Sequence, residues 1–145
     1  MTIIVKNIAR ITLGLIFLFG LYIVMHGHLT PGGGFAGGVI IALALVLYVL
    51  AFGSTRAEEK IEKFWASALE GMGAVMFIGL ALIGFKGGFF FLNVLPKGQP
   101  GQMLSAGMIP LENIAIMLKV GVGLFAVFLA LITFNVTVNK KDKTE

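Results

Sequence analysis

A glycine-rich segment separates two apolar runs of this chain, each long enough to cross a membrane. It covers residues 26–38, reads His-Gly-His-Leu-Thr-Pro-Gly-Gly-Gly-Phe-Ala-Gly-Gly, and holds six glycines and one proline. Backbone N–H and C=O groups at membrane depth need partners, because a bilayer core has no water to supply them. Such a segment is tolerated there where it packs against protein or lines a wet cavity. The segment therefore predicts a chain built to pack against other membrane helices.

The composition is that of an integral membrane protein. Hydrophobic residues make up 58% of the 145 residues and charged residues 12%, whereas a soluble domain carries roughly 25% charged residues. Mean hydropathy is +0.99. There is no cysteine, which excludes disulfides and thiolate-bound clusters. The first apolar run is followed by no small-residue cleavage site, so we expect no cleavable signal peptide.

Four apolar runs approach the length of about 20 residues that a transmembrane helix needs. They cover roughly residues 4–25, 35–52, 64–85 and 111–136. The sequence therefore predicts an all-α integral membrane protein of one domain, residues 1–145, with four transmembrane helices. The glycine-rich segment links the first two helices. The loop over residues 86–110 is long and aperiodic, which is typical of a functional loop or one docked on a partner.

The positive residues are distributed unevenly between the two sides of the membrane. With four spans, both termini and the middle loop share one side. That side carries eight Lys and Arg residues: Lys6, Arg10, Arg56, Lys60, Lys63, Lys140, Lys141 and Lys143. The other side carries two, Lys86 and Lys97. Cytoplasmic loops hold the excess of positive charge, so both termini are expected to be cytoplasmic.

The glycine-rich segment admits two interpretations. Gly33 with Gly37, and Gly34 with Gly38, form two G-x-x-x-G pairs, a spacing that lets helix backbones approach closely. The first interpretation is therefore tight helix packing. The second is a flexible entry to the second span beside an ion path. The segment is not a phosphate-binding loop, because it lacks the required lysine and follows no strand.

The beginning of the second helix is predicted from Thr30 and Pro31. Threonine is a common N-cap residue, and proline is favoured at the first helical position. We therefore expect the helix to begin near Pro31.

His26 and His28 flank Gly27 in the same segment. An i, i+2 pair of histidines can chelate a metal, but without a nearby carboxylate or cysteine the site is poor. A proton relay is a second role, because histidine titrates near pH ~6.5. The third interpretation, which we favour, is two interfacial histidines bonded to the backbone.

Two ionisable residues lie inside predicted spans, Glu70 and Lys119. Each costs roughly 2.5–3.5 kcal/mol at a span centre on insertion scales, so each is expected to face protein or water. Their neighbours at helical spacing include small residues, which mark a packed face. For Glu70, snorkelling to the cytoplasmic interface is equally consistent with the sequence. For Lys119 we favour a functional role.

A direct pair between these two residues is not expected from their positions in the spans. Glu70 lies roughly 9 Å from the cytoplasmic end of the third span, and Lys119 roughly 12 Å from the outer end of the fourth, at 1.5 Å per residue. In a core about 30 Å thick, roughly 9 Å then separates their Cα levels. An acid on another subunit is the partner we consider for Lys119.

The segment over residues 26–38 resembles the signature of the B subunit of Mrp/Mnh-type multisubunit Na⁺/H⁺ antiporters, in the pattern G-H-x-T-P-G-G-G-F-x-G-G. Chain length and the four spans agree with that family. The same subunit type occurs in membrane-bound hydrogenase-like respiratory complexes, which contain an Mrp-like antiporter module. The resemblance implies a prokaryotic plasma-membrane subunit that needs its siblings. It also places Pro31 and Phe35 on motif positions linked to antiport.

These observations predict an accessory, non-catalytic subunit of an Mrp-type cation/proton antiporter module that packs against sibling subunits and helps to form the sodium path. No catalytic triad, carboxylate pair or cofactor fingerprint is present, so we expect no enzyme activity, no cofactor, no metal and no nucleic-acid partner. The expected partners are sibling membrane subunits, lipid, Na⁺ and H⁺. The candidate ion-path residues are Lys119, Pro31, Phe35, His26, His28 and Glu70, and the candidate packing residues are Gly33, Gly34, Gly37 and Gly38.

Two other functions remain open at this stage. One is a small homodimeric four-span drug or cation transporter, which would need an embedded coupling acid. The other is a purely structural assembly subunit. Transport by the purified chain alone in vesicles would single out the homodimeric transporter.

The predicted orientation can be tested with reporter fusions. A reporter joined at Lys143 should be active on the cytoplasmic side, and one inserted beside Lys97 should be active outside, because of the eight-to-two distribution of positive residues. The reverse pair of activities would overturn the topology.

Overall fold

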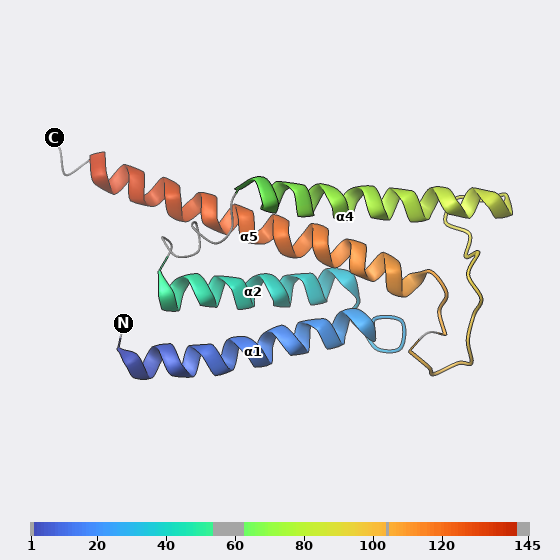
Figure 1. Cartoon of the computed structure of the whole chain (residues 1–145), viewed down its shortest axis with the longest axis horizontal. Helices are drawn as coiled ribbons and strands as arrows, with labels where there is room; N and C mark the ends of the chain where they lie inside the picture. The colour runs from blue at the N-terminus through green and yellow to red at the C-terminus, as the bar shows by residue number, and fades with distance from the viewer. Residues whose placement is uncertain (1, 54–62, 104, 142–145) are drawn as a thin grey trace.

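The computed structural model describes residues 2–53, 63–103 and 105–141, and for residues 63–65 and 135–141 it describes the backbone alone. Helices α1 (Ile3–Met25), α2 (Gly34–Phe52), α4 (Lys63–Ile83) and α5 (Ile109–Lys141) follow one another, and the short 3-10 helix η1 (Gly84–Gly87) continues α4 (Figure 1). The described residues contain no strand. Four stretches of these helices are long and apolar enough to span a membrane. The predicted all-α membrane protein with four spans is confirmed.

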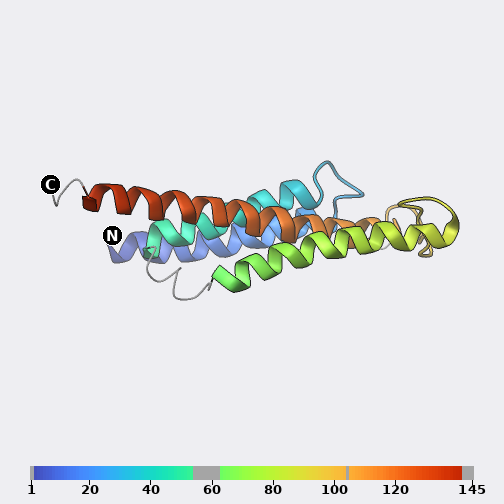
Figure 2. The same ribbon diagram turned by 90° about the horizontal axis from the view of Figure 1, so that it is seen from above.

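The helices pack in the order α1, α2, α5, α4, so that α4 contacts α5 and lies apart from α1 (Figures 1 and 2). Helix α2 is the most enclosed, since 39% of its span is buried within the chain against 17% for each of the other three. At its second half, Val49 packs against Phe125 of α5 in the core of the molecule. The arrangement leaves much of α1 and α4 on the outside.

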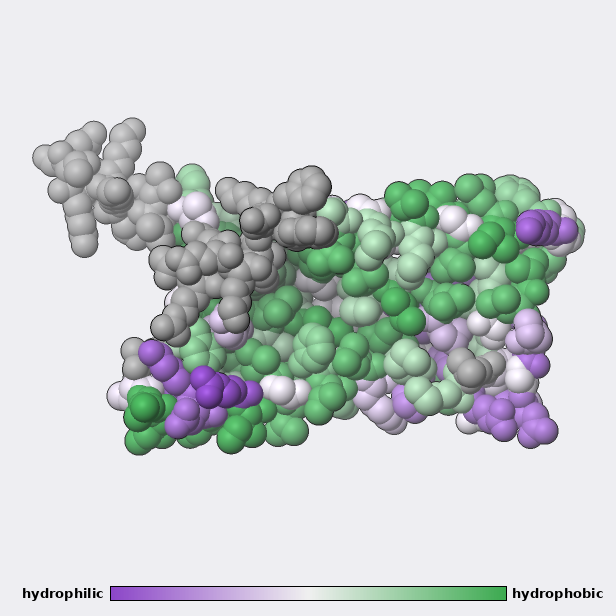
Figure 3. Space-filling view, in the orientation of Figure 1, coloured by the Kyte–Doolittle hydropathy of each residue, from purple (hydrophilic) through white to green (hydrophobic). Residues whose placement is uncertain are grey.

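Apolar residues cover the middle of the molecule, and hydrophilic residues gather at its two ends (Figure 3). The beginning of α1 and the end of α5 lie at the same end (Figure 1). There the guanidinium carbon of Arg10 lies 5.9 Å from the ring centroid of Phe52, at the end of α2. The cytoplasmic location of this end stays a prediction. Arg56 and Lys60, on which it partly depends, lie outside the described residues.

Helix α2 begins at Gly34 and not near Pro31, so the predicted Thr30–Pro31 helix start is wrong. Gly32 and Gly33 have φ angles of +154° and +99°, and a right-handed helix cannot pass through residues in these conformations. The hydroxyl of Thr30 donates to the backbone oxygen of His26 at 3.2 Å and caps no helix. Residues 26–33 therefore form a loop outside α2.

Two glycine faces of α2 meet two different helices. A Cβ atom on Gly38 would lie 3.1 Å from the backbone oxygen of Met117, and one on Gly34 would overlap the backbone of Asn113, both in α5. On the other face, a Cβ on Gly37 would lie 2.9 Å from the backbone oxygen of Gly20 in α1. Helix α2 thus approaches both neighbours at backbone distance, within this one chain.

The long outer loop folds back on the ends of α4 and α5. The side-chain oxygen of Asn93 accepts hydrogen bonds from the backbone N–H groups of Leu95 and Met108, at 3.2 and 3.1 Å. The N–H of Phe91 donates to the backbone oxygen of Ala81 at 3.3 Å. These bonds satisfy backbone groups of the loop and hold it beside the first turn of α5.

Gly34→Leu should destabilise the chain and lower the yield of any complex that contains it, because the side chain would force α2 and α5 apart. Gly14→Leu is the matched control, since a Cβ at Gly14 meets nothing within 4 Å. Native-gel analysis of membranes that express each variant makes the comparison. Equal yields of the two variants would contradict backbone-distance packing of α2.

Candidate functional site

The glycine-rich segment is organised around one buried amide, Asn113 of α5. Its side-chain oxygen accepts a hydrogen bond from the N–H of Gly34 at 3.0 Å, and the residue is 8% exposed. The N–H groups of a first helical turn lack intrahelical partners, so this bond caps α2 from a neighbouring helix. A Cβ on Gly27 would lie 2.8 Å from Asn113 Nδ2, and one on Gly33 3.1 Å from Oδ1. Because Gly27 and Gly33 carry no Cβ atom, the Asn113 amide has space beside them.

Sequence reasoning missed Asn113. The signal was available, because a single amide inside an apolar run must find a partner at membrane depth. Its partner could not be read from the sequence, since Gly34 lies 79 positions earlier in the chain.

Each of the two histidines bonds to a different backbone oxygen, and they share no hydrogen-bond partner. His26 Nδ1 donates to the oxygen of Tyr22 at 3.0 Å, and the two rings stack with centroids 4.2 Å apart. His28 Nε2 donates to the oxygen of Gln102 at 3.2 Å and so ties the glycine-rich loop to the outer loop. Among the described residues, no three His, Cys, Asp or Glu side chains gather as metal ligands would. This geometry agrees with the backbone-bonded interpretation.

Pro31 and Phe35 lie on the outside of the motif that Asn113 organises. Pro31 is exposed in the loop, and Phe35 is 65% exposed on the first turn of α2. The neighbouring residues Gly33, Gly34, Gly37 and Gly38 are all buried. The motif thus has a packed glycine side and an exposed side that carries the two residues.

Glu70 of α4 and Lys119 of α5 form an ion pair. Lys119 Nζ donates to Glu70 Oε1 at 2.6 Å. The side chains are 50% exposed for Lys119 and 34% exposed for Glu70, so the pair lies on the surface of the chain. Lys119 is ten residues into α5, roughly 15 Å along the helix at 1.5 Å per residue. The pair therefore lies near the middle of the apolar stretch of α5, Ile109–Phe134.

The expectation that these residues do not pair directly is wrong. That expectation assumed that both spans begin and end at the two membrane surfaces. In the structure α4 reaches beyond the other helices at the end that carries the outer loop (Figure 1). Glu70 thereby reaches the level of Lys119, and the carboxylate lies over Gly123, whose Cβ position is 3.7 Å from the Glu70 side chain.

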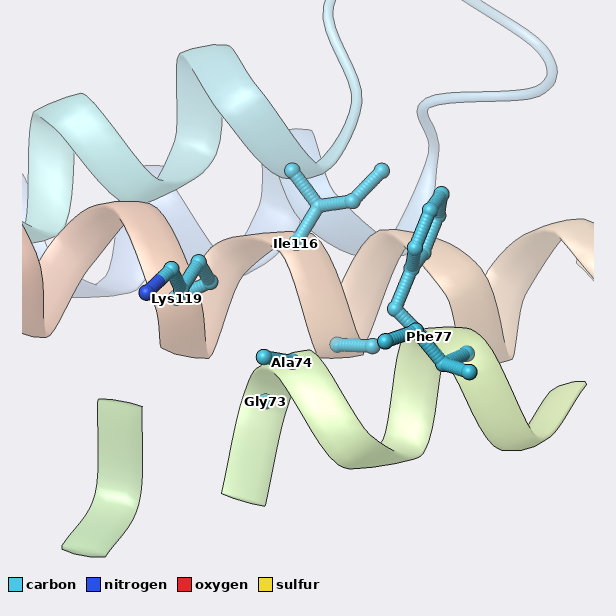
Figure 4. A pocket seen from close by; sticks show the side chains of 7 residues that line it. Gly73, Ala74, Phe77, Ile116 and Lys119 are labelled. Carbon is cyan, nitrogen blue, oxygen red and sulfur yellow. The ribbon is translucent and has the colours of Figure 1, made fainter. Parts of the chain in front are cut away.

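A cleft of about 300 Å³ opens beside the pair, between α4 and α5. Lys119 lies at one end of it and Phe77 beyond Ala74 towards the other (Figure 4). The remaining lining residues are apolar or small: Gly73, Ile78, Ala115 and Ile116. Two opposite charges in contact compensate each other in such surroundings, whereas removal of one leaves the other unpaired at membrane depth. The pair thus places two opposite charges beside an otherwise apolar cleft.

The sequence model of one protein family matches residues 4–126 and is described as a domain related to the MnhB subunit of Na⁺/H⁺ antiporters. The chain belongs to the MnhB family. The predicted resemblance to the antiporter B subunit is confirmed.

Relatives of this chain occur in archaea and bacteria. It is 38% identical to an uncharacterised protein of Methanocaldococcus jannaschii over 140 residues, which is 90% of this chain and 52% of that protein. A Staphylococcus epidermidis protein named as antiporter subunit mnhB2 is 40% identical over 50 residues, 34% of this chain and 36% of its own length.

A solved structure is also similar to this chain. It is part of the membrane-bound sulfane sulfur reductase, an archaeal respiratory membrane complex, and matches with a TM-score of 0.75 and 34% identity over 88% of this chain and 56% of that one. The chain thus spans about half the length of this solved chain and of the archaeal relative.

Asn113→Ala should destabilise the chain, because it removes the acceptor that caps α2. Loss of a capping side chain typically costs about 0.5–2 kcal/mol. Thermal unfolding in lipid nanodiscs measures the effect, with Asn7→Ala, at an exposed asparagine of α1, as the control. If both variants unfold at the same temperature, the cap does not stabilise α2.

Proposed function

We propose that this chain is an accessory, non-catalytic subunit of an Mrp-type cation/proton antiporter module in a prokaryotic plasma membrane. The family description refers to a Na⁺/H⁺ antiporter subunit, and the staphylococcal relative is named as one. The similar solved chain is part of a multisubunit membrane complex. Four apolar helices with large exposed faces suit a subunit that is covered by siblings.

The Glu70–Lys119 ion pair is the observation that carries the proposed role in the ion path. Both charges lie at membrane depth on the surface of the chain, at 34% and 50% exposure, where lipid would solvate neither. A pair in that position is retained where it faces water or polar protein. We place the sodium path along this side of α4 and α5, and the pair would set the electrostatic potential that a passing cation meets. The glycine motif, with Pro31 and Phe35 on its exposed side, lies beyond it towards the outer loops.

A respiratory complex is the host that the similarities favour. The match to the sulfane sulfur reductase complex covers 88% of this chain, whereas the staphylococcal antiporter subunit matches 34% of it. Co-purification of iron–sulfur subunits with the tagged chain would support this host. Co-purification of antiporter subunits alone would support the free-standing form.

The homodimeric transporter receives less support. Such a transporter needs an embedded acid that is free to bind its ion, and Glu70, the acid within the third span, is already bonded to Lys119 at 2.6 Å.

Lys119→Ala should lower sodium-dependent proton transport several-fold in vesicles that contain the purified complex, because it removes the positive charge beside the path. Helix packing should survive, since alanine keeps the Gly73 contact with α5 intact. Transport is compared at equal amounts of reconstituted complex, so that a change in complex yield does not enter the transport rate. Lys97→Ala, at an exposed outer-loop residue, is the matched control. Unchanged transport in Lys119→Ala would remove Lys119 from the ion path.

A further inference from the structure

We propose that the groove between α4 and α5 receives a transmembrane helix of a sibling subunit, and that this helix places a carboxylate against Lys119. The groove is lined by Gly73, Ala74, Phe77, Ile78, Ala115, Ile116 and Lys119. This inference rests on the proposed function in so far as it requires sibling membrane subunits. It adds the site of contact and the chemistry of the partner.

The charge of the groove decides the chemistry. An ammonium group has three N–H donors, and Glu70 Oε1 accepts one from Lys119. Lys119 is half exposed and Glu70 34% exposed, so the lysine side chain is the more accessible member of the pair. The surrounding residues offer no further acceptor, because the rest of the lining is apolar. A partner carboxylate supplies the strongest acceptor for the remaining donors.

The shape of the groove favours the insertion of a third helix. A Cβ on Gly73 would lie 2.8 Å from both the oxygen of Ala115 and the nitrogen of Lys119. Helices α4 and α5 are therefore already at backbone distance, and no closer packing of the two can fill the cleft of about 300 Å³. Gly73, Ala74 and Ala115 in the lining are small residues, which leaves room for the side chains of a crossing helix.

Two other occupants fit less well. A lipid acyl chain would fill the apolar volume but brings no acceptor to Lys119, since its headgroup lies roughly half the core thickness away. A second copy of this chain, related by a two-fold axis, would present the same surface patch and bring Lys119 towards Lys119. Repulsion between like charges opposes that arrangement.

Photo-crosslinking in the intact complex tests the inference. A benzoylphenylalanine probe replaces Ile78, which lines the groove and is 56% exposed. The tagged chain is irradiated in native membranes, purified, and the crosslinked peptide is sequenced by mass spectrometry. We expect an apolar segment of a sibling subunit with Asp or Glu about two helical turns from the crosslinked residue, because Glu70, which bonds Lys119, lies roughly 12 Å along α4 from Ile78 at 1.5 Å per residue. A crosslink to lipid alone, to a second copy of this chain, or to a segment without an acid would overturn the proposal.

A charge-swapped pair, Glu70→Lys with Lys119→Glu, gives a second readout. It keeps the ion pair within the chain but turns an acidic group towards the partner carboxylate. The crosslink from position 78 should fall at least ten-fold, whereas a crosslink at wild-type yield would contradict a carboxylate partner.

A filled groove gives a third readout that does not depend on the ion pair. Ala74→Phe should abolish the crosslink, because the new ring occupies the groove. Ala68→Phe should retain it, since Ala68 is exposed about 120° around α4 from Ala74. Equal crosslinking in both variants would overturn the proposal even if the charge-swapped chain fails to fold. Sibling subunits that co-purify without any groove crosslink would leave the proposed function standing and remove this inference.

Discussion

The bilayer core supplies no hydrogen bonds, and this constraint decides where the polar groups of the chain find their partners. The first N–H of α2 is satisfied by the amide oxygen of Asn113, 3.0 Å away on α5. The ammonium of Lys119 is satisfied by Glu70, 2.6 Å away on α4. Both bonds use α5, which therefore joins α2 on one side to α4 on the other. Without these partners each group would be unpaired at membrane depth.

Glycine determines how closely the helices meet once those bonds are placed. Helix α2 touches α5 through Gly34 and Gly38 and touches α1 through Gly37, all at backbone distance. Helix α4 repeats the arrangement with Gly73 against α5. Packing of this kind relies on van der Waals contact, because lipid and apolar side chains differ little in polarity. The resulting row of helices, α1 to α2 to α5 to α4, leaves the ion pair and its groove on an outer face. The same close packing that builds the chain thereby exposes the site we assign to a partner.

The number and nature of the elements could be predicted from sequence, because apolar runs of spanning length dominate the chain. The G-x-x-x-G pairs also pointed to close backbone contact, although not to which helix each glycine meets. The rules for helix starts gave the wrong result at Thr30 and Pro31. The positive φ angles of Gly32 and Gly33 and the cap from α5 make the helix begin at Gly34 instead.

Counting residues from the ends of the spans gave the wrong relative depths for Glu70 and Lys119, because the count cannot detect that α4 is displaced along α5. Asn113 was missed because its role depends on a residue 79 positions away. Each of these three outcomes depends on how the helices pack against one another, which the local sequence does not specify.

A double-mutant cycle on Glu70 and Lys119 tests most directly whether the two charges stabilise each other within the span. Glu70→Gln, Lys119→Met and the double variant would be compared with the natural chain by thermal unfolding in lipid nanodiscs. Residues in contact typically show coupling of about 0.5–3 kcal/mol. We predict a favourable coupling of about 1 kcal/mol or more, so that the double variant is less destabilised than the sum of the two single variants. Additivity within about 0.5 kcal/mol would mean that the two side chains are independent, and it would contradict an ion pair between α4 and α5.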